Sequence, residues 1–143
     1  MQFDSENNVV KLCAKGMELE ANAQLDEAYK QFLKAWNEAN NDFERFTAAH
    51  YVARCQETVE EKLLWDEKAL ACALKIDDEG MIANYPSLYL NIAKCYEDLK
   101  DHENAKINYQ KALSYANKLP DNGYGSMIRA GIKGGLERLL ILQ

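Results

Sequence analysis

The chain has 143 residues, of which 48% are hydrophobic and 28% charged, and its formal net charge is −6 at pH 7. This length fits one domain that buries roughly two-thirds of its unfolded surface. The acidic balance argues against nucleic acid as a partner. Apolar runs are far shorter than the ~18 residues of a membrane span, and the start of the chain lacks the pattern of a signal peptide. We therefore expect a cytoplasmic protein with no membrane contact.

The segments between breaks in the sequence are rich in helix-forming residues. Only two prolines occur, and no segment alternates regularly between apolar and polar residues. The chain is therefore predicted to be all-α, with about seven helices joined by connections short enough to make neighbours antiparallel. The predicted breaks fall at Asn22–Gln24, Asn40–Asp42, Glu57–Val59, Asp77–Gly80, Lys100–Asp101 and Leu119–Gly123.

Several helix boundaries have a local reason. Pro86 is expected in the first turn of a helix, where its missing N–H costs nothing. Asp101 is expected to cap the next helix, with Glu103 facing the positive end of the helix dipole. The segment 119–123 combines Leu-Pro-Asp-Asn-Gly and predicts a stop before the last helix.

The first and the third part of the chain repeat each other, with one constant offset for all matching positions. Small residues at matching places would let two helices approach closely, and large residues would fill the gaps between helix pairs. The matching pairs are Gly16 and Ala93, Leu19 and Tyr96, Ala28 and Ala105, Phe32 and Tyr109, and Ala35 and Ala112. Between them, the AHYVARCQE segment resembles LNIAKCYED, which predicts Ala53 as the counterpart of Ala93 and Cys55 as that of Cys95.

These positions resemble the tetratricopeptide repeat family, over about residues 5–118. The third unit fits closely through Tyr89, Ile92, Ala93, Tyr96, Ala105, Tyr109 and Ala112. The middle unit is divergent, with Trp65 where a small residue is expected. The resemblance implies one domain over 1–143, with antiparallel hairpins at about 5–40, 42–77 and 82–118 stacked as a right-handed superhelix. A capping helix at about 122–142 would close the end of this stack.

The same stretches also resemble a group of small bacterial tetratricopeptide proteins, through PSLYLNIAKCYEDL and LPDNGYGSMIRAGIKGGLERL. This resemblance implies a bacterial cytoplasmic origin and adds no chemistry. In the predicted capping helix, Gly131 and Gly135 lie on one face, and we expect them to allow close packing on the third hairpin. The alternative is that each glycine only weakens the helix, by about 1 kcal/mol.

The fold implies that the first helix of each hairpin lines a concave surface that holds a ligand. Donors gather there, and we predict a groove for a peptide or protein segment with an acidic group or a free carboxylate. The predicted groove residues are His50, Tyr51, Arg54, Asn91, Lys94 and Arg129. The first unit presents Cys13, Ala14 and Met17, so the carboxylate clamp of chaperone-binding relatives is not reproduced. The alternative is that these charges form solvated helix faces.

No pattern in the sequence predicts catalysis, a metal or another cofactor. The four cysteines form no CxxC pair and match no zinc template. His50 and Cys55 are five apart on one predicted helix, so their side chains point about 140° apart and would not meet. Phosphate-loop, dinucleotide and HExxH motifs do not occur. We expect a non-enzymatic interaction scaffold whose partner is an unknown protein or peptide. The alternatives are a homodimer formed through the apolar C-terminal end, and a regulator that binds RNA or a signalling peptide.

Overall fold

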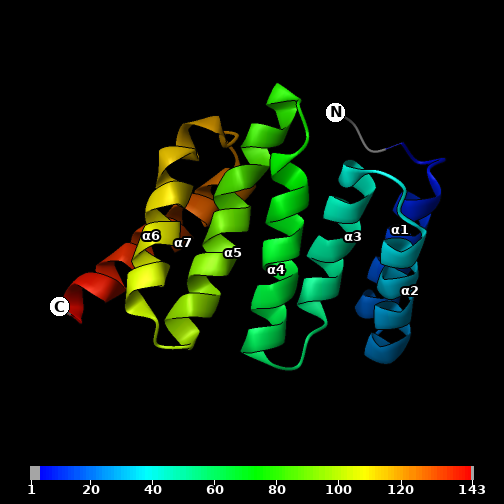
Figure 1. Ribbon diagram of the computed structural model, residues 1–143, viewed down its shortest axis with the longest axis horizontal. Coiled ribbons are helices and arrows are strands. Elements are labelled where there is room, and N and C mark those ends of the chain that lie inside the picture. Colours follow the sequence, from blue (N-terminus) through cyan, green and yellow to red (C-terminus); the bar gives the residue numbers. More distant parts are fainter. Residues whose placement is uncertain (1–3, 143) are drawn as a thin grey trace. The chain divides into compact units, whose positions relative to one another are not determined.

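The computed structural model describes residues 4–142, and over this range it contains only helices, turns and irregular connections. The all-α prediction with seven α-helices is confirmed (Figure 1), whereas two short 3-10 helices were not predicted. The elements are α1 (Asn8–Ala21), α2 (Leu25–Glu38), α3 (Asp42–Arg54), α4 (Val59–Leu74), η1 (Glu79–Asn84), α5 (Tyr85–Asp98), α6 (His102–Ser114), η2 (Ala116–Lys118) and α7 (Gly123–Ile141).

The chain divides into two compact units, Met1–Ile76 and Asp77–Gln143. The first unit contains the hairpins α1–α2 and α3–α4, and the second contains the hairpin α5–α6 followed by α7. A single domain and a right-handed superhelix through all three hairpins stay predictions.

Most of the α-helices are capped at the N-terminus by a polar side chain. This side chain accepts a hydrogen bond from a backbone N–H that has no partner within the first turn. Asn41 caps α3 and Thr58 caps α4 in this way. The cap at Asp101 is confirmed, because its Oδ1 accepts from the backbone N–H of Asn104 at 3.1 Å. The predicted stop before the last helix is also present, since Asn122 caps α7. Pro86 lies in the first turn of α5, as predicted.

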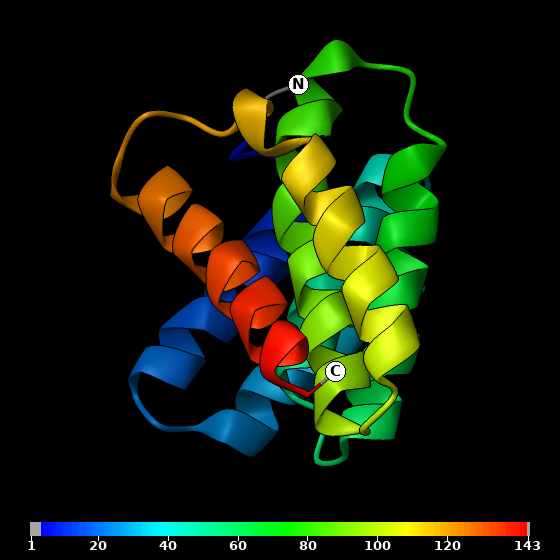
Figure 2. The ribbon, with the colours of Figure 1, turned by 90° about the vertical axis from the view of Figure 1, so that its left-hand side faces the viewer.

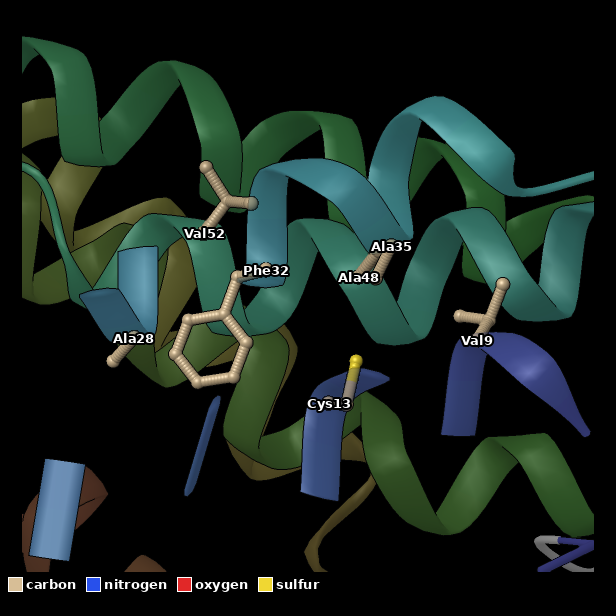
Figure 3. Packing of buried hydrophobic residues seen from close by; sticks show 7 residues of the cluster. All are labelled: Val9, Cys13, Ala28, Phe32, Ala35, Ala48 and Val52. Atoms are coloured by element: carbon tan, nitrogen blue, oxygen red, sulfur yellow. The ribbon is translucent and has the colours of Figure 1, made fainter. Parts of the chain in front are cut away.

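The core of the first unit is built around Phe32 on α2, whose side chain is fully buried. Figure 3 shows Phe32 among buried side chains from α1, α2 and α3. Its ring stacks on that of Tyr51, with centroids 5.1 Å apart. Gly16 on α1 allows this packing, because a Cβ at this position would overlap the Phe32 ring. The close approach of α1 and α2 therefore depends on the absence of a side chain at Gly16.

In the second unit α7 packs against both helices of the α5–α6 hairpin (Figure 2). A Cβ at Gly135 would overlap the Tyr109 ring, and a Cβ at Gly131 would lie 3.0 Å from Cδ2 of Leu90. The close packing predicted for these two glycines is confirmed. Arg138 on α7 adds a two-point ion pair with Glu97 on α5, through Nε at 2.7 Å and a terminal nitrogen at 3.0 Å.

The helix bounds correct the alignment of the middle hairpin. Helices α1, α3 and α5 begin at Asn8, Asp42 and Tyr85, so the step from the second hairpin to the third is longer than the step from the first to the second. This register aligns Ala93 with His50, and the predicted pairing of Ala93 with Ala53 is therefore wrong. The longer step arises because α4 has 16 residues where α2 has 14, and because the connection that contains η1 is longer than the one after α2.

The corrected register changes which residues are equivalent. His50 takes the place of Gly16 and Ala93, and Asp66 takes the place of the buried rings of Phe32 and Tyr109. Asp66 is only 3% exposed, and Lys62 one turn earlier contacts it at 2.6 Å. The middle hairpin thus carries a charged pair where the other two carry an aromatic side chain. This difference explains why its apolar pattern is weak in the sequence.

Candidate functional site

A cavity of about 180 Å³ opens between α1 and α3 within the first unit. This apolar cavity is lined by Val10, Cys13, Ala14, Met17, Thr47 and Tyr51. The four residues from α1 lie on one face of that helix. Ala14 and Met17 are exposed at the cavity, whereas Cys13 is 3% exposed. The apolar cavity is therefore open to solvent along α1, and the buried core of the first unit forms its floor.

The polar atoms at the apolar cavity are already neutralised or paired. Burial raises the pKa of the Cys13 thiol to about 12, so the thiol stays protonated at neutral pH. The Thr47 hydroxyl donates to the backbone carbonyl of Phe43 at 2.9 Å. Burial also raises the pKa of Tyr51, which keeps its hydroxyl neutral. The cavity can therefore accept an apolar side chain without burying a charged group away from water.

Arg54 and Glu20 form an ion pair beside Tyr51, one of the residues that line the apolar cavity. The pair joins the last turns of α3 and α1, with the guanidinium nitrogen 3.0 Å from the carboxylate oxygen. The guanidinium also lies over the Tyr51 ring, 5.4 Å from its centroid. Arg54 is therefore held by a carboxylate and an aromatic face together.

A second cavity, of about 510 Å³, lies where the Arg54–Glu20 pair meets the two hairpin turns of the first unit. We call it the acidic cavity, because four carboxylates and one guanidinium line it. Its residues are Glu20, Leu25, Asp26, Tyr29, Arg54, Cys55, Gln56, Glu57 and Glu61. Gln56 is fixed there by donating to the Tyr29 hydroxyl at 3.3 Å and to the Val52 carbonyl at 3.0 Å.

A third cavity, of about 350 Å³, lies toward the opposite ends of α1 and α3 and shares Val10 with the apolar cavity. Polar groups in this region are tied together by the buried side chain of Glu44. Its carboxylate accepts from the backbone N–H of Asn40 at 3.1 Å and from the side-chain amide of Asn41 at 3.0 Å. The cavities therefore follow the line between α1 and α3, with the apolar one in the middle.

Three of the predicted groove residues lie in the first unit, and two of them border these cavities. Tyr51 lines the apolar cavity, and Arg54 lines the acidic one. His50 is instead influenced by α4: burial lowers its pKa, while the charge of Asp66 opposes this shift. Its ring contacts that of Tyr51 edge-on, with centroids 5.4 Å apart. His50 is thus better placed to support Tyr51 than to meet a ligand at the apolar cavity.

The other three predicted residues lie in the second unit. On α5, Asn91 is half-buried and Lys94 is exposed. On α7, Arg129 donates to the backbone carbonyls of Leu119 at 3.1 Å and Ala116 at 3.4 Å. The Arg129 guanidinium thereby holds the connection that precedes α7. A groove shared by residues of both units stays a prediction.

The sequence placed Cys13, Ala14 and Met17 on the first unit's surface without predicting a binding cavity there, and the acids of the neighbouring cavity were not predicted. A signal for the apolar cavity was present, because Val10, Ala14 and Met17 recur at helical spacing on a predicted first helix. The acids that line the second cavity come from different helices and turns, so only the folded chain brings them together.

Metal sites and membrane spans are absent from the described part of the chain. Within residues 4–142, no three side chains of the His, Cys, Asp or Glu type gather as a metal site would require. Among the helices of the same range, none combines the length and the apolar character needed to cross a membrane.

Residues 86–119, which span most of α5, all of α6 and η2, match the model of the tetratricopeptide repeat family. No curated protein and no solved structure gives a significant match to the chain. Repeats of this family generally mediate protein–protein interaction and are typically non-enzymatic. The suspected resemblance to the tetratricopeptide repeat family is confirmed at the third hairpin, where residues 86–119 are similar to one repeat of that family.

Proposed function

We propose that this protein is a non-enzymatic interaction scaffold that binds a peptide segment of a partner protein at the apolar cavity between α1 and α3. The observation that carries the proposal is the cavity itself, of about 180 Å³ and lined mainly by apolar side chains. Pockets that are apolar with a few fixed polar groups are the usual sites for an anchoring side chain. Met17, which is 45% exposed, supplies a flexible apolar wall that adapts to such a side chain.

The test selects peptides from a displayed random library on the immobilised full-length chain and measures their affinity for matched variants. Ala14→Leu places a larger side chain in the apolar cavity while keeping a strong helix former on an exposed position. Ala130→Leu makes the same change at an exposed position of α7. We expect the first variant to weaken binding by about tenfold or more and the second to leave it unchanged. Failure to enrich any peptide, or equal binding by both variants, would overturn the proposal.

The donors predicted on both units extend this proposal. Tyr51 and Arg54 would border the bound segment directly. Asn91 and Lys94 would add a second contact region on α5, and His50 and Arg129 would act by supporting their neighbours. An Arg54→Ala/Lys94→Ala double variant that binds the selected peptides more weakly than Arg54→Ala would support a role for the second unit. Equal affinity of the two would confine the site to the first unit.

Self-association is a second candidate, because the C-terminal end of α7 exposes three apolar side chains in succession. Leu140, Ile141 and Leu142 are 64%, 82% and 60% exposed. Light scattering of the full chain beside Ile141→Lys/Leu142→Lys tests this candidate. A dimer that the substitutions convert to a monomer would support it, and a monomer at all concentrations would remove it.

A further inference from the structure

The first unit carries most of the net negative charge of the chain, and part of this charge lies beside the proposed binding site. Residues 1–76 contain 14 acidic and 9 basic side chains, a net charge of −5, whereas the whole chain carries −6. Four of these acids line the acidic cavity, where Arg54 is the one basic residue among the lining side chains. This cavity has a volume of about 510 Å³, so it has room for a long side chain.

Most of these acids are not neutralised within the protein. Glu20 is paired with Arg54 at 3.0 Å. Asp26, Glu57 and Glu61 form no ion pair with any other residue in the range 4–142, and all three are exposed. Carboxylates of like charge that share one cavity repel one another, and a cation placed among them relieves this repulsion.

The apolar and the acidic cavity are close enough for one segment to fill both. Tyr51 lines the first and Arg54 lines the second, and these residues are one turn apart on α3. One turn of helix rises by about 5 Å. Residues three or four apart on a helix, or two apart on an extended chain, cover a similar distance.

We infer that the bound segment carries an apolar side chain for the apolar cavity and, one helical turn away, a lysine or arginine for the acidic cavity. This inference rests on the proposed function and names the partner's chemistry. It differs from the acidic group expected from the sequence, since an added carboxylate would face Asp26, Glu57 and Glu61. Arg54 does not offset this repulsion, because its charge is already shared with Glu20. The complementary charge would steer the partner and fix its direction along α1 and α3.

The experiment compares the selected peptides and then reverses the charge of the cavity. Peptides that bind the wild-type chain should contain a Lys or Arg near the apolar residue, and their binding should weaken as salt is added. Glu57→Lys/Glu61→Lys should lower their affinity by about tenfold or more. Glu103→Lys/Glu137→Lys makes the same change in net charge at exposed positions of α6 and α7, and should change the affinity by less than about twofold.

The outcomes separate this inference from the proposed function. Peptides that lose affinity with Ala14→Leu but carry no basic residue, or that bind the Glu57→Lys/Glu61→Lys variant as well as wild type, would overturn the inference and leave the proposed function in place. Enrichment of acidic peptides would overturn it in the same way. A selection that yields no peptide sensitive to Ala14→Leu would overturn both.

Discussion

Ala23 and Lys100 occupy matching places in the first and third hairpins and have the same left-handed backbone conformation, with φ of 62° and 65°. Each follows a first helix, and the next residue closes the same hydrogen bond. The N–H of Gln24 donates to the carbonyl of Leu19 at 2.8 Å, and that of Asp101 donates to the carbonyl of Tyr96 at 2.9 Å. The first and third hairpins therefore share one turn in detail, of the kind that ends many helices with a glycine.

The absence of glycine from these turns leads to a prediction about stability. A left-handed residue with a Cβ costs roughly 1–2 kcal/mol relative to the right-handed region. Ala23→Gly and Lys100→Gly should therefore each raise the free energy of unfolding, by about 1 kcal/mol after the added flexibility of the unfolded chain is subtracted. Urea denaturation measures the difference.

Two controls make the same substitution at exposed helical positions. Ala21→Gly in the last turn of α1 and Gln110→Gly in α6 should lower the free energy of unfolding by about 0.5–1 kcal/mol. If glycine has the same effect in the turns as in the helices, the turns store no strain.

Alanine substitutions at two adjacent glycines of α7 should have opposite effects on the free energy of unfolding. Gly135→Ala places a Cβ that overlaps the Tyr109 ring and should lower the free energy of unfolding by about 1–3 kcal/mol. Gly134→Ala places a Cβ 3.3 Å from Nη1 of Arg138, the guanidinium nitrogen outside the ion pair with Glu97, and should raise the free energy of unfolding by about 0.5–1 kcal/mol through helix propensity. Thermal unfolding of the two variants measures both signs. Equal effects would contradict close packing of α7 at Gly135.

Removing one partner of the charged pair in the middle hairpin should lower the stability of the protein. Lys62→Ala removes the ammonium group from Asp66, which is 3% exposed, and should cost about 1–3 kcal/mol although alanine is the better helix former. Adding Asp66→Leu should recover much of this loss, because it restores an apolar residue at a place where the other hairpins bury a ring. Chemical denaturation of the single and double variants measures the recovery.

The control for the charged pair is Lys30→Ala, which breaks an exposed pair with Glu27 on α2. This substitution should change the free energy of unfolding by less than about 0.5 kcal/mol. A double variant that is no more stable than Lys62→Ala would show that Asp66 has a role besides pairing.

Glu97 should make the stability of the second unit depend on pH in the acidic range. Its carboxylate accepts from Arg138 and, at 2.6 Å, from the Tyr109 hydroxyl. These bonds, the one from Arg138 above all, lower the pKa of Glu97 to about 2. An unfolded glutamate has a pKa of about 4.3, so the stabilisation is complete above that pH and is lost as the pH falls toward about 2.

Glu97→Gln should therefore lower the free energy of unfolding by about 1–3 kcal/mol at neutral pH and by progressively less below a pH of about 4. Urea denaturation at a series of pH values measures the convergence. Glu103→Gln, at an exposed position of α6, should give a curve nearly parallel to that of wild type. A constant difference between Glu97→Gln and wild type down to a pH of about 2 would contradict the shifted pKa.

Much of the helical organisation could be predicted from local sequence. Asp101 and the segment 119–123 mark boundaries because a cap or a stop acts through bonds to residues a few positions away. The repeat of the first hairpin in the third was visible because both bury the same kinds of side chain at matching places, such as Phe32 and Tyr109. The match over 86–119 falls on the hairpin that keeps this pattern best.

The register of the middle hairpin could not be predicted from the sequence, since Asp66 and Lys62 replace the apolar residues on which an alignment depends. The residues of the candidate site were still harder to predict. Ala14 and Tyr51 are distant in sequence, yet they line one cavity because α1 packs against α3. The sequence by itself determined where helices begin and which hairpins repeat, through short-range hydrogen bonds and apolar periodicity. Only tertiary packing decided which side chains enclose the cavities and where unpaired acids gather, because both depend on contacts between residues far apart in the chain.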